Sequence, residues 1–387
     1  MAQYALNCNV IFGIGELENL GKEAKKMGAH KVCVGIDSFF VGGKYETKIK
    51  ELLKAEGIDC VFFGGFRPDP DCTDVDKCVE LILKENCDFV IAFGGGSTID
   101  GSKASAVTAK NGGKCWNYCT QKRTIENGKL PVIAVPTTSG TGSEVSHGAV
   151  ISNRELEIKS GIAGPVVFPE LAIVDPAITV DVPKWQTACT GFDVFAHAFE
   201  SYMLSTSTPL SEATALEAIR LFGEHFINAV EDGSDLNARE GMSKASTLAG
   251  FNIALTDTCV GHLMGLPLSV YCHIPHGATL AAVLDHIAAW IYPNEKERLA
   301  VVTRTLRPEL GVLSIDEQAK MLGDVLRDFM VKAGIDKSLK DYGVKEEDIE
   351  KFLTYMDNTF GIGTPVWQPF ARVATREDIR NIYKAAL

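Results

Sequence analysis

Residues 88–107 read DFVIAFGGGSTIDGSKASAV, and this stretch decides the expected fold. A short apolar run suited to a buried strand is followed by Gly94–Gly96, and Ser97 then opens a helical pattern. Glycines let the backbone approach a diphosphate closely, and the helix N-terminus offers free N–H groups and the positive end of its dipole. A glycine-rich turn alone is about equally compatible with a plain tight turn, but its position after a buried strand favours a nucleotide site.

The same alternation of apolar runs and helical patterns extends through the N-terminal half of the chain. Strands are expected at Lys31–Ile36, Asp59–Phe63, Asp88–Phe93, Pro131–Val135 and Leu171–Val174, and the opening residues MAQYALNCNVIFG read as the first strand. Helical segments lie between them, including Glu16–Met27, Lys44–Glu56 and Thr73–Glu85. This order predicts an α/β domain with a mostly parallel, Rossmann-like sheet and helices on both faces.

The pattern changes after a proline-punctuated region at residues 164–184. From Lys184 to the end the periodicity is nearly all helical, with no convincing strand. A length of 387 residues usually means two domains. We therefore expect an α/β nucleotide-binding domain over residues 1–180 and an all-α domain over residues 181–387.

Composition and charge exclude several classes of function. A net charge of −12 with no run of Lys or Arg argues against a nucleic-acid partner. No stretch approaches 18 uncharged apolar residues, so no membrane span is expected, and the N-terminus lacks the pattern of a secretory signal. The 11 cysteines are scattered without a C-x-x-C pair, which favours reduced thiols in a cytoplasmic protein.

A second loop resembles the glycine- and hydroxyl-containing turn that follows residues 88–93. The segment PVIAVPTTSGTGSEV places five hydroxyl side chains directly after an expected strand. These residues are Thr137, Thr138, Ser139, Thr141 and Ser143. A structural turn needs only one or two such side chains, so their density favours ligand binding.

Asp37 ends the strand KVCVGI and indicates which dinucleotide would bind. A carboxylate there can accept hydrogen bonds from both ribose hydroxyls and would repel a 2′-phosphate, which favours NAD over NADP. The alternative is a helix N-cap before Ser38. Gly13 and Gly15 are followed by Glu18, so the standard G-x-G-x-x-G fingerprint is absent.

Asp193, His197, His262 and His276 carry the strongest chemical signal in the C-terminal half. The first two lie four residues apart in TGFDVFAHAFES, a spacing that places both side chains on one helix face. An arbitrary pair of this kind is more often a surface salt bridge, but here the neighbours are almost all apolar, and buried charges need a partner or a metal. One carboxylate and three imidazoles suit Zn²⁺ or Fe²⁺ better than Mg²⁺ or Ca²⁺.

Together, the segments GGGSTID, PTTSGTGSEV, DVPKWQTACTGFDVFAHAFESY and GH…HIPHG resemble the iron-containing (group III, metal-dependent) alcohol dehydrogenase family over essentially the whole chain. The resemblance implies a dehydroquinate synthase-like architecture, a cleft holding NAD and one divalent metal, and a homodimer or a multiple of dimers. It implies that Asp193, His197, His262 and His276 bind the metal. The positions that it matches to the dinucleotide site are Asp37, Gly94, Gly95, Gly96, Ser97, Asp100, Thr137, Thr138, Thr141, Ser143 and Lys159. Members act between small alcohols and aldehydes by hydride transfer.

The chain departs from the family pattern where the substrate is expected. Many members carry a second histidine four residues after the third ligand, and this position is Leu266. Leucine cannot relay protons, so His273 becomes a candidate for the catalytic proton donor, the alternative being a pocket-wall histidine. A small residue, Gly148, stands where many relatives have a bulky one.

The candidate substrate residues are His147, Gly148, Asn252 and Arg372. Together with His273, these residues suit a short aldehyde with a polar or anionic tail, and sulfoacetaldehyde reductases belong to the family. A general propanediol- or butanol-type alcohol dehydrogenase is the alternative.

Two further alternatives lie outside the dehydrogenases. A dehydroquinate synthase-like lyase would need basic residues for its phosphorylated substrate, but Thr187–Tyr202 and Gly250–Asp285 contain no Lys or Arg. A dinucleotide-binding protein without catalysis would not need the complete set of four metal ligands. Metal content tests the non-catalytic alternative, and only an activity assay separates the lyase from the dehydrogenase.

Overall fold

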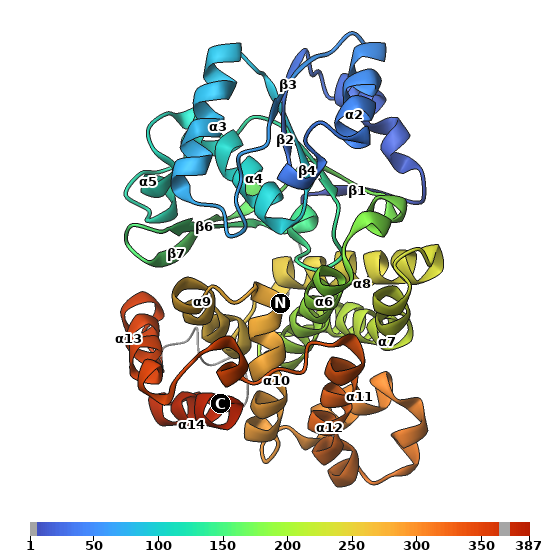
Figure 1. Cartoon of the computed structure of the whole chain (residues 1–387), viewed down its shortest axis with the longest axis vertical. Coiled ribbons are helices and arrows are strands. Elements are labelled where there is room, and N and C mark those ends of the chain that lie inside the picture. The colour runs from blue at the N-terminus through green and yellow to red at the C-terminus, as the bar shows by residue number, and fades with distance from the viewer. Residues whose placement is uncertain (1–5, 364–371) are drawn as a thin grey trace. The chain divides into compact units, whose positions relative to one another are not determined.

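The computed structural model describes residues 6–363 and 372–387 (Figure 1). Two compact units divide the chain between Thr179 and Val180. We call the unit before this point the α/β unit and the one after it the helical unit.

A six-stranded parallel sheet forms the centre of the α/β unit. Its strand order is β1-β8-β5-β4-β2-β3, and every pair of neighbours is parallel. The strands are β1 (Asn9–Phe12), β2 (Lys31–Ile36), β3 (Asp59–Phe63), β4 (Phe89–Gly94), β5 (Val132–Pro136) and β8 (Leu171–Val174). The expected parallel sheet is confirmed, with β4 and β5 each beginning one residue later than the sequence indicated.

Helices cover both faces of this sheet because its strands alternate between two cores. Val32 and Val34 of β2 pack into one core together with α1 (Leu20–Lys26) and α2 (Lys44–Ala55). Cys33 packs into the opposite core, which includes residues of α3 (Cys72–Glu85) and α4 (Gly96–Asn111). Figure 1 shows α2 on one side of the strands and α3 and α4 on the other. A strand buried on both faces reads as a continuous apolar run, which is why these strands were recognisable.

The chain order creates a topological switch point between β2 and β4. From β2 the chain moves outward to β3, whereas from β4 it moves in the opposite direction to β5 and β8. Ligands of open α/β sheets bind beyond the carboxyl ends of the strands at such a point. Asp37 follows β2 and Gly95 follows β4, and the Asp37 N–H donates to the Phe93 carbonyl at 3.0 Å.

Two elements of the α/β unit were not expected from the sequence. An antiparallel hairpin joins β6 (Gly148–Asn153) to β7 (Ile158–Ala163), and α5 (Cys115–Cys119) is a single short helix. Half of each hairpin strand is polar or exposed, so neither strand gives the apolar run that marked the central sheet.

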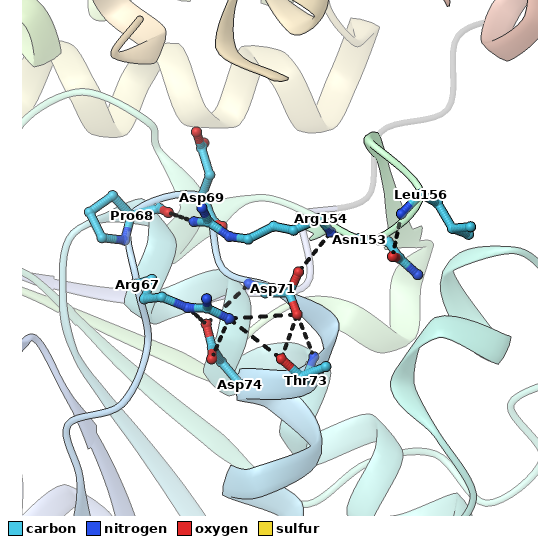
Figure 2. A network of polar contacts seen from close by, with 9 residues as sticks. All are labelled: Arg67, Pro68, Asp69, Asp71, Thr73, Asp74, Asn153, Arg154 and Leu156. Atoms are coloured by element: carbon cyan, nitrogen blue, oxygen red, sulfur yellow. Dashed lines mark hydrogen bonds and ion pairs between the residues drawn. The ribbon is translucent and has the colours of Figure 1, made fainter. Parts of the chain in front are cut away.

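Asp71 connects the hairpin to the loop before α3 (Figure 2). Its buried carboxylate accepts hydrogen bonds from the Thr73 N–H at 3.0 Å and from the Arg154 N–H at 2.9 Å. The Ser152 N–H donates to the Pro70 carbonyl at 2.8 Å. One side chain therefore caps α3 and fixes the hairpin beside it.

The helical unit contains no strand within the described residues 180–363 and 372–387, as the sequence predicted. Helix α6 is buried along nearly its whole length and packs against α7, α8 and α10. The α-helices are α6 (Lys184–Met203), α7 (Pro209–Glu231), α8 (Leu236–Thr256), α9 (Val260–Cys272), α10 (His276–Ile291), α11 (Lys296–Leu306), α12 (Ile315–Ala333), α13 (Ile349–Phe360) and α14 (Arg376–Ala386).

Within the described part of the chain, no single helix combines the length and hydropathy needed to cross a membrane. Helices α8 and α9 reach these values only when joined, and they are bent by 104° at their junction.

We expect Asp71→Asn to destabilise the α/β unit. The amide keeps the volume but presents an N–H₂ group to one backbone N–H, which loses about 1–3 kcal/mol. In thermal unfolding, this corresponds to a decrease in Tm of about 2–4 °C for each kcal/mol in a protein of 150–250 residues. Asp59→Asn is the control, because Asp59 is exposed at the start of β3. Equal unfolding midpoints for the two variants would contradict the structural role of Asp71.

Candidate functional site

Helix α6 carries three ionisable side chains along one buried face. Asp193, His197 and Glu200 are separated by four and three residues, the spacing of neighbours on a helix surface. They are 2%, 5% and 0% exposed. His262 lies in the first turn of α9, and His276 is the first residue of α10. Three helices therefore bring one carboxylate and three imidazoles together.

The distances within this group fit the shell of a single metal ion. Asp193 Oδ1 lies 3.6 Å from His197 Nδ1, 3.5 Å from His262 Nε2 and 3.8 Å from His276 Nε2. Donor atoms of Asp193, His262 and His276 all lie within 4.8 Å of one another. Metal–ligand bonds of about 2.0–2.1 Å in a tetrahedral site place neighbouring donor atoms about 3.4 Å apart. The observed separations are too long for hydrogen bonds but close to this value.

Three buried polar atoms in this group have no hydrogen-bond partner among the described residues. They are Asp193 Oδ1, His197 Nδ1 and His262 Nε2. An unsatisfied buried polar group costs about 1–3 kcal/mol, so native structures rarely leave three together. All three can donate an electron pair, and a divalent cation would satisfy them at once. The residues present therefore fit a metal.

Burial disfavours the charged forms of the side chains in this group. Burial disfavours the Asp193 carboxylate, but His197, His262 and His276 hold its pKa well below the usual range. Burial lowers the pKa of His197 to about 4, so this imidazole is neutral, the form that binds metals. Burial also disfavours the charged form of His262, but Glu200 and Asp193 raise its pKa to about 9.

Glu200 is a functional candidate that the sequence reasoning missed. Its Oε2 lies 2.7 Å from His262 Nδ1, on the side of the ring opposite Nε2. A sequence signal existed, because Asp193, His197 and Glu200 occupy positions i, i+4 and i+7 of one helix. Only the tertiary structure shows that Glu200 contacts His262 rather than solvent.

Two glycines allow the three helices to approach closely enough to form the group. A Cβ on Gly277, next to His276, would lie 1.9 Å from the Cys189 carbonyl oxygen of α6. A Cβ on Gly265 of α9 would lie 2.5 Å from Thr279 Oγ1 of α10. The first contact is with backbone, which cannot move aside by a rotamer change.

In the α/β unit, the glycine-rich turn and the hydroxyl-rich loop pack against each other. The Thr137 N–H donates to the Gly94 carbonyl at 3.0 Å. A Cβ on Gly96 would lie 2.5 Å from Thr141 Cγ2, and one on Gly95 would lie 3.3 Å from Thr138 Oγ1. The contact between the two loops therefore favours glycine at both positions, whether or not a cofactor is bound.

Asp37 acts as a helix N-cap, the role that the sequence offered as the alternative to ribose binding. Its Oδ1 accepts from the Phe39 N–H at 3.0 Å and so caps the short helix Ser38–Phe40. The carboxylate is half-buried at the end of β2, where a second oxygen can still accept a hydrogen bond. Capping and ribose binding are thus compatible.

Asp100 of α4 contacts Ser143 at the end of the hydroxyl-rich loop. The Ser143 hydroxyl donates to Asp100 Oδ1, and the Val150 N–H donates to Asp100 Oδ2 at 2.9 Å. The fully buried Lys103 donates to the Ser143 carbonyl at 2.8 Å. These side chains brace the loop against α4 and the hairpin, a role that the sequence did not reveal.

Ser97 and Lys159 both contact Asp69. The Asp69 N–H donates to Ser97 Oγ at 3.2 Å, and Lys159 Nζ lies 2.7 Å from Asp69 Oδ1. Asp69 thus links the glycine-rich turn to β7. Burial lowers the pKa of Lys159, although the Asp69 carboxylate opposes this shift.

The candidate substrate residues are divided between the two units. His147 and Gly148 belong to the α/β unit, where the His147 ring lies 5.9 Å from the Phe168 ring and a Cβ on Gly148 would meet open space. In the helical unit, Asn252 is fully buried and its amide contacts Thr214 Oγ1 at 2.6 Å. Arg372 pairs with Asp378 at 2.5 Å.

Leu266 and His273 lie on α9 beyond His262. Leu266 is half-buried and packs against the core of the helical unit. His273 is exposed and ends α9 in the left-handed conformation, with φ of 55°. One turn after His262, the helix therefore presents an aliphatic side chain and not a second imidazole.

Comparisons with known proteins show the family of the chain. The profile of the family described as "Iron-containing alcohol dehydrogenase" matches residues 7–176, and that of "Fe-containing alcohol dehydrogenase family, C-terminal" matches residues 187–387. The chain belongs to the iron-containing alcohol dehydrogenase family.

The NAD-dependent methanol dehydrogenase of Bacillus methanolicus is 32% identical over 379 residues, 97% of each protein. A solved structure of a 1,3-propanediol oxidoreductase aligns with a TM-score of 0.94 at 28% identity, covering 100% of both chains. The sulfoacetaldehyde reductase of Bifidobacterium kashiwanohense, solved in complex with NAD⁺, aligns with a TM-score of 0.88 at 31% identity, covering 100% of this chain and 98% of that one. This iron-containing alcohol dehydrogenase therefore has relatives that act on different small molecules.

We expect Gly277→Ala to disrupt the candidate metal site. The added methyl group forces α10 away from the Cys189 carbonyl, and overpacking of this kind costs about 1–3 kcal/mol, occasionally more. His276 then moves away from Asp193, so both Tm and metal affinity decrease. Gly311→Ala is the control, since nothing lies within 4 Å of a Cβ there. Unchanged metal content in Gly277→Ala would show that the site tolerates a wider helix spacing.

Proposed function

We propose that this protein is an NAD(H)-dependent, divalent-metal-dependent alcohol dehydrogenase that interconverts a short-chain aldehyde and its primary alcohol. Asp193, His197, His262 and His276 hold the metal. The observation that carries the proposal is the set of three buried, unpartnered atoms that face one another across α6 and α9. A bound divalent metal would use all three of these atoms as ligands.

The donor set accepts either Fe²⁺ or Zn²⁺. Membership of the iron-containing family favours Fe²⁺ as the resident ion. A bound metal would polarise the substrate oxygen, and a bound nicotinamide would exchange hydride with the adjacent carbon. The protein side chains fix positions and exclude water, while His273 is proposed as the group that exchanges the proton.

NAD is proposed to bind at the switch point of the parallel sheet. The Gly94–Gly96 turn and the helix it precedes would hold the diphosphate, and Asp37 the adenosine ribose. The proposed cofactor residues also include Ser97, Asp100, Thr137, Thr138, Thr141, Ser143 and Lys159. Asp100 and Ser143 contact each other, so they would contribute to cofactor binding by fixing the shape of the loop.

A neutral substrate fits the helical unit better than an anionic one. The α6 segment Thr187–Tyr202 and the α8–α10 segment Gly250–Asp285 contain no Lys or Arg. Arg372, the cation expected to meet an anionic tail, is paired with Asp378 and lies over the Trp290 ring at 5.0 Å. A short uncharged alcohol such as a propanediol or butanol is therefore the first candidate.

Sulfoacetaldehyde is the second candidate substrate, favoured by the relative of that activity at 31% identity. In this case His147, Gly148 and His273 would have to accommodate the sulfonate.

A homodimer and a cytoplasmic location stay predictions. Light scattering coupled to size-exclusion chromatography measures the oligomeric state.

The test of the proposed function is NADH oxidation by protein of known metal content. We expect propanal and 3-hydroxypropanal to be reduced with a higher kcat/KM than sulfoacetaldehyde. Chelation abolishes the activity, and Fe²⁺ or Zn²⁺ restores it. Asp193→Asn lowers the metal content and decreases kcat/KM at least about 10²-fold, because a carboxylate ligand to a buried cation is lost.

Asp285→Asn is the matched control, since Asp285 is a buried carboxylate of α10 that pairs with Arg327. Activity confined to sulfoacetaldehyde would replace the first substrate candidate by the second. Metal binding without any aldehyde reduction would overturn the dehydrogenase function.

Asp37→Asn should shift the cofactor preference toward NADP. The amide oxygen still caps the Phe39 N–H, but the negative charge that repels a 2′-phosphate is removed. The ratio of kcat/KM for NADH to that for NADPH should decrease about tenfold, equivalent to about 1.4 kcal/mol. Asp59→Asn serves as a charge-matched control on the neighbouring strand. An unchanged ratio would restrict Asp37 to its capping role.

A further inference from the structure

Glu200 is fully buried and accepts four hydrogen bonds from the start of α9. Its Oε2 accepts from the Cys259 N–H at 2.7 Å and lies 2.7 Å from His262 Nδ1. Its Oε1 accepts from the Gly261 N–H at 2.6 Å and the His262 N–H at 3.3 Å. A Cβ on Gly261 would lie 2.6 Å from this oxygen, so glycine is required for the approach. No Lys or Arg pairs with this carboxylate in the described residues.

The contact with His262 fixes which ring nitrogen carries the proton. A carboxylate can only accept a hydrogen bond, so the imidazole donates through Nδ1–H. In the neutral ring, which is the form that binds metals, Nε2 then presents its lone pair, and this atom is the one that faces Asp193 Oδ1 at 3.5 Å. The same hydrogen bond orients the ring.

The charge of the group also points to a metal partner for Glu200. Asp193 and Glu200 contribute two negative charges to a region in which both side chains are at most 2% exposed. One divalent cation with neutral imidazoles brings the total to zero. Without it, two carboxylates would share a buried region with only histidines to balance them, an arrangement that burial makes costly.

We propose that Glu200 is a positioning residue that sets the tautomer and orientation of His262 for the metal and supplies the second compensating charge. This inference rests on the proposed function, because it needs a metal between Asp193 and the three histidines. It goes further by assigning part of the metal affinity to a side chain that does not contact the ion. Loss of such an outer hydrogen-bond partner typically reduces metal affinity about 10–100-fold.

Glu200 also caps the N-terminus of α9, so a purely structural role must be separated from the positioning role. The two roles differ in what Glu200→Gln changes. The amide retains one oxygen for the backbone N–H groups, but its N–H₂ group facing His262 donates to Nδ1. The proton then moves to Nε2, which blocks the atom that binds the metal.

The experiment is a Co²⁺ titration of chelator-stripped protein, followed by visible absorption and calorimetry. We expect Glu200→Gln to bind Co²⁺ about 10–100-fold more weakly than the wild type, with an altered d–d spectrum. Asp71→Asn is the matched control, because Asp71 is a buried carboxylate that caps a helix in the other unit. It should lower the Tm without changing the Co²⁺ affinity.

A wild-type affinity in Glu200→Gln, whatever its Tm, would overturn the positioning role. Failure of the wild-type protein itself to bind Co²⁺ would overturn the proposed metal site, and this result is distinguishable because it needs no variant.

Nitrogen NMR of the zinc-loaded wild type gives a test that does not depend on how the variant folds. We expect the His262 ring to be protonated at Nδ1, with its proton hydrogen-bonded and shifted downfield. A ring coordinated through Nδ1 and protonated at Nε2 would contradict the proposal.

Discussion

The close approach of α6, α9 and α10 is the constraint on which the helical unit depends. Gly277 permits α10 to contact the α6 backbone at Cys189, and that contact places His276 beside Asp193. Apolar side chains surround the group, and Asp193 Oδ1, His197 Nδ1 and His262 Nε2 are buried there without a hydrogen-bond partner among the described residues. The packing that stabilises the helical unit and the geometry of the candidate metal site therefore arise from the same contacts.

The α/β unit applies a different constraint to its own candidate site. Its loops follow strands that are fixed by parallel pairing, and the switch between β2 and β4 leaves their carboxyl ends open. The turn at Gly94–Gly96 and the loop at Thr137–Ser143 then pack on each other. The fully buried Lys103 of α4 donates a hydrogen bond to the Ser143 carbonyl and so holds that loop against the helix. Contacts within the α/β unit therefore hold both loops in place.

Side chains of the same chemical type have two different roles in this protein. Some face a candidate ligand position, and others form contacts that stabilise the fold. The four metal candidates converge, as the sequence indicated. Asp100 and Ser143 instead bond to each other, and Arg372 pairs with Asp378. Glu200 lies on the same helix face as Asp193 and His197, yet no feature of the sequence identifies His262 as its partner. Motif matching finds polar residues in the right segment, but it does not distinguish a ligand contact from a brace.

The sequence by itself determined the parallel sheet and the helical second half, since both follow from local periodicity, and residue type together with the family resemblance indicated the four candidate metal ligands. Strands buried on both faces are apolar throughout, and Asp193 and His197 share a helix turn. The hairpin at Gly148–Ala163, the partner of Glu200 and the internal pairing of Arg372 were decided only by the tertiary structure. They depend on contacts between segments far apart in the chain, and hydrogen-bonding capacity does not reveal in advance which partner burial will provide.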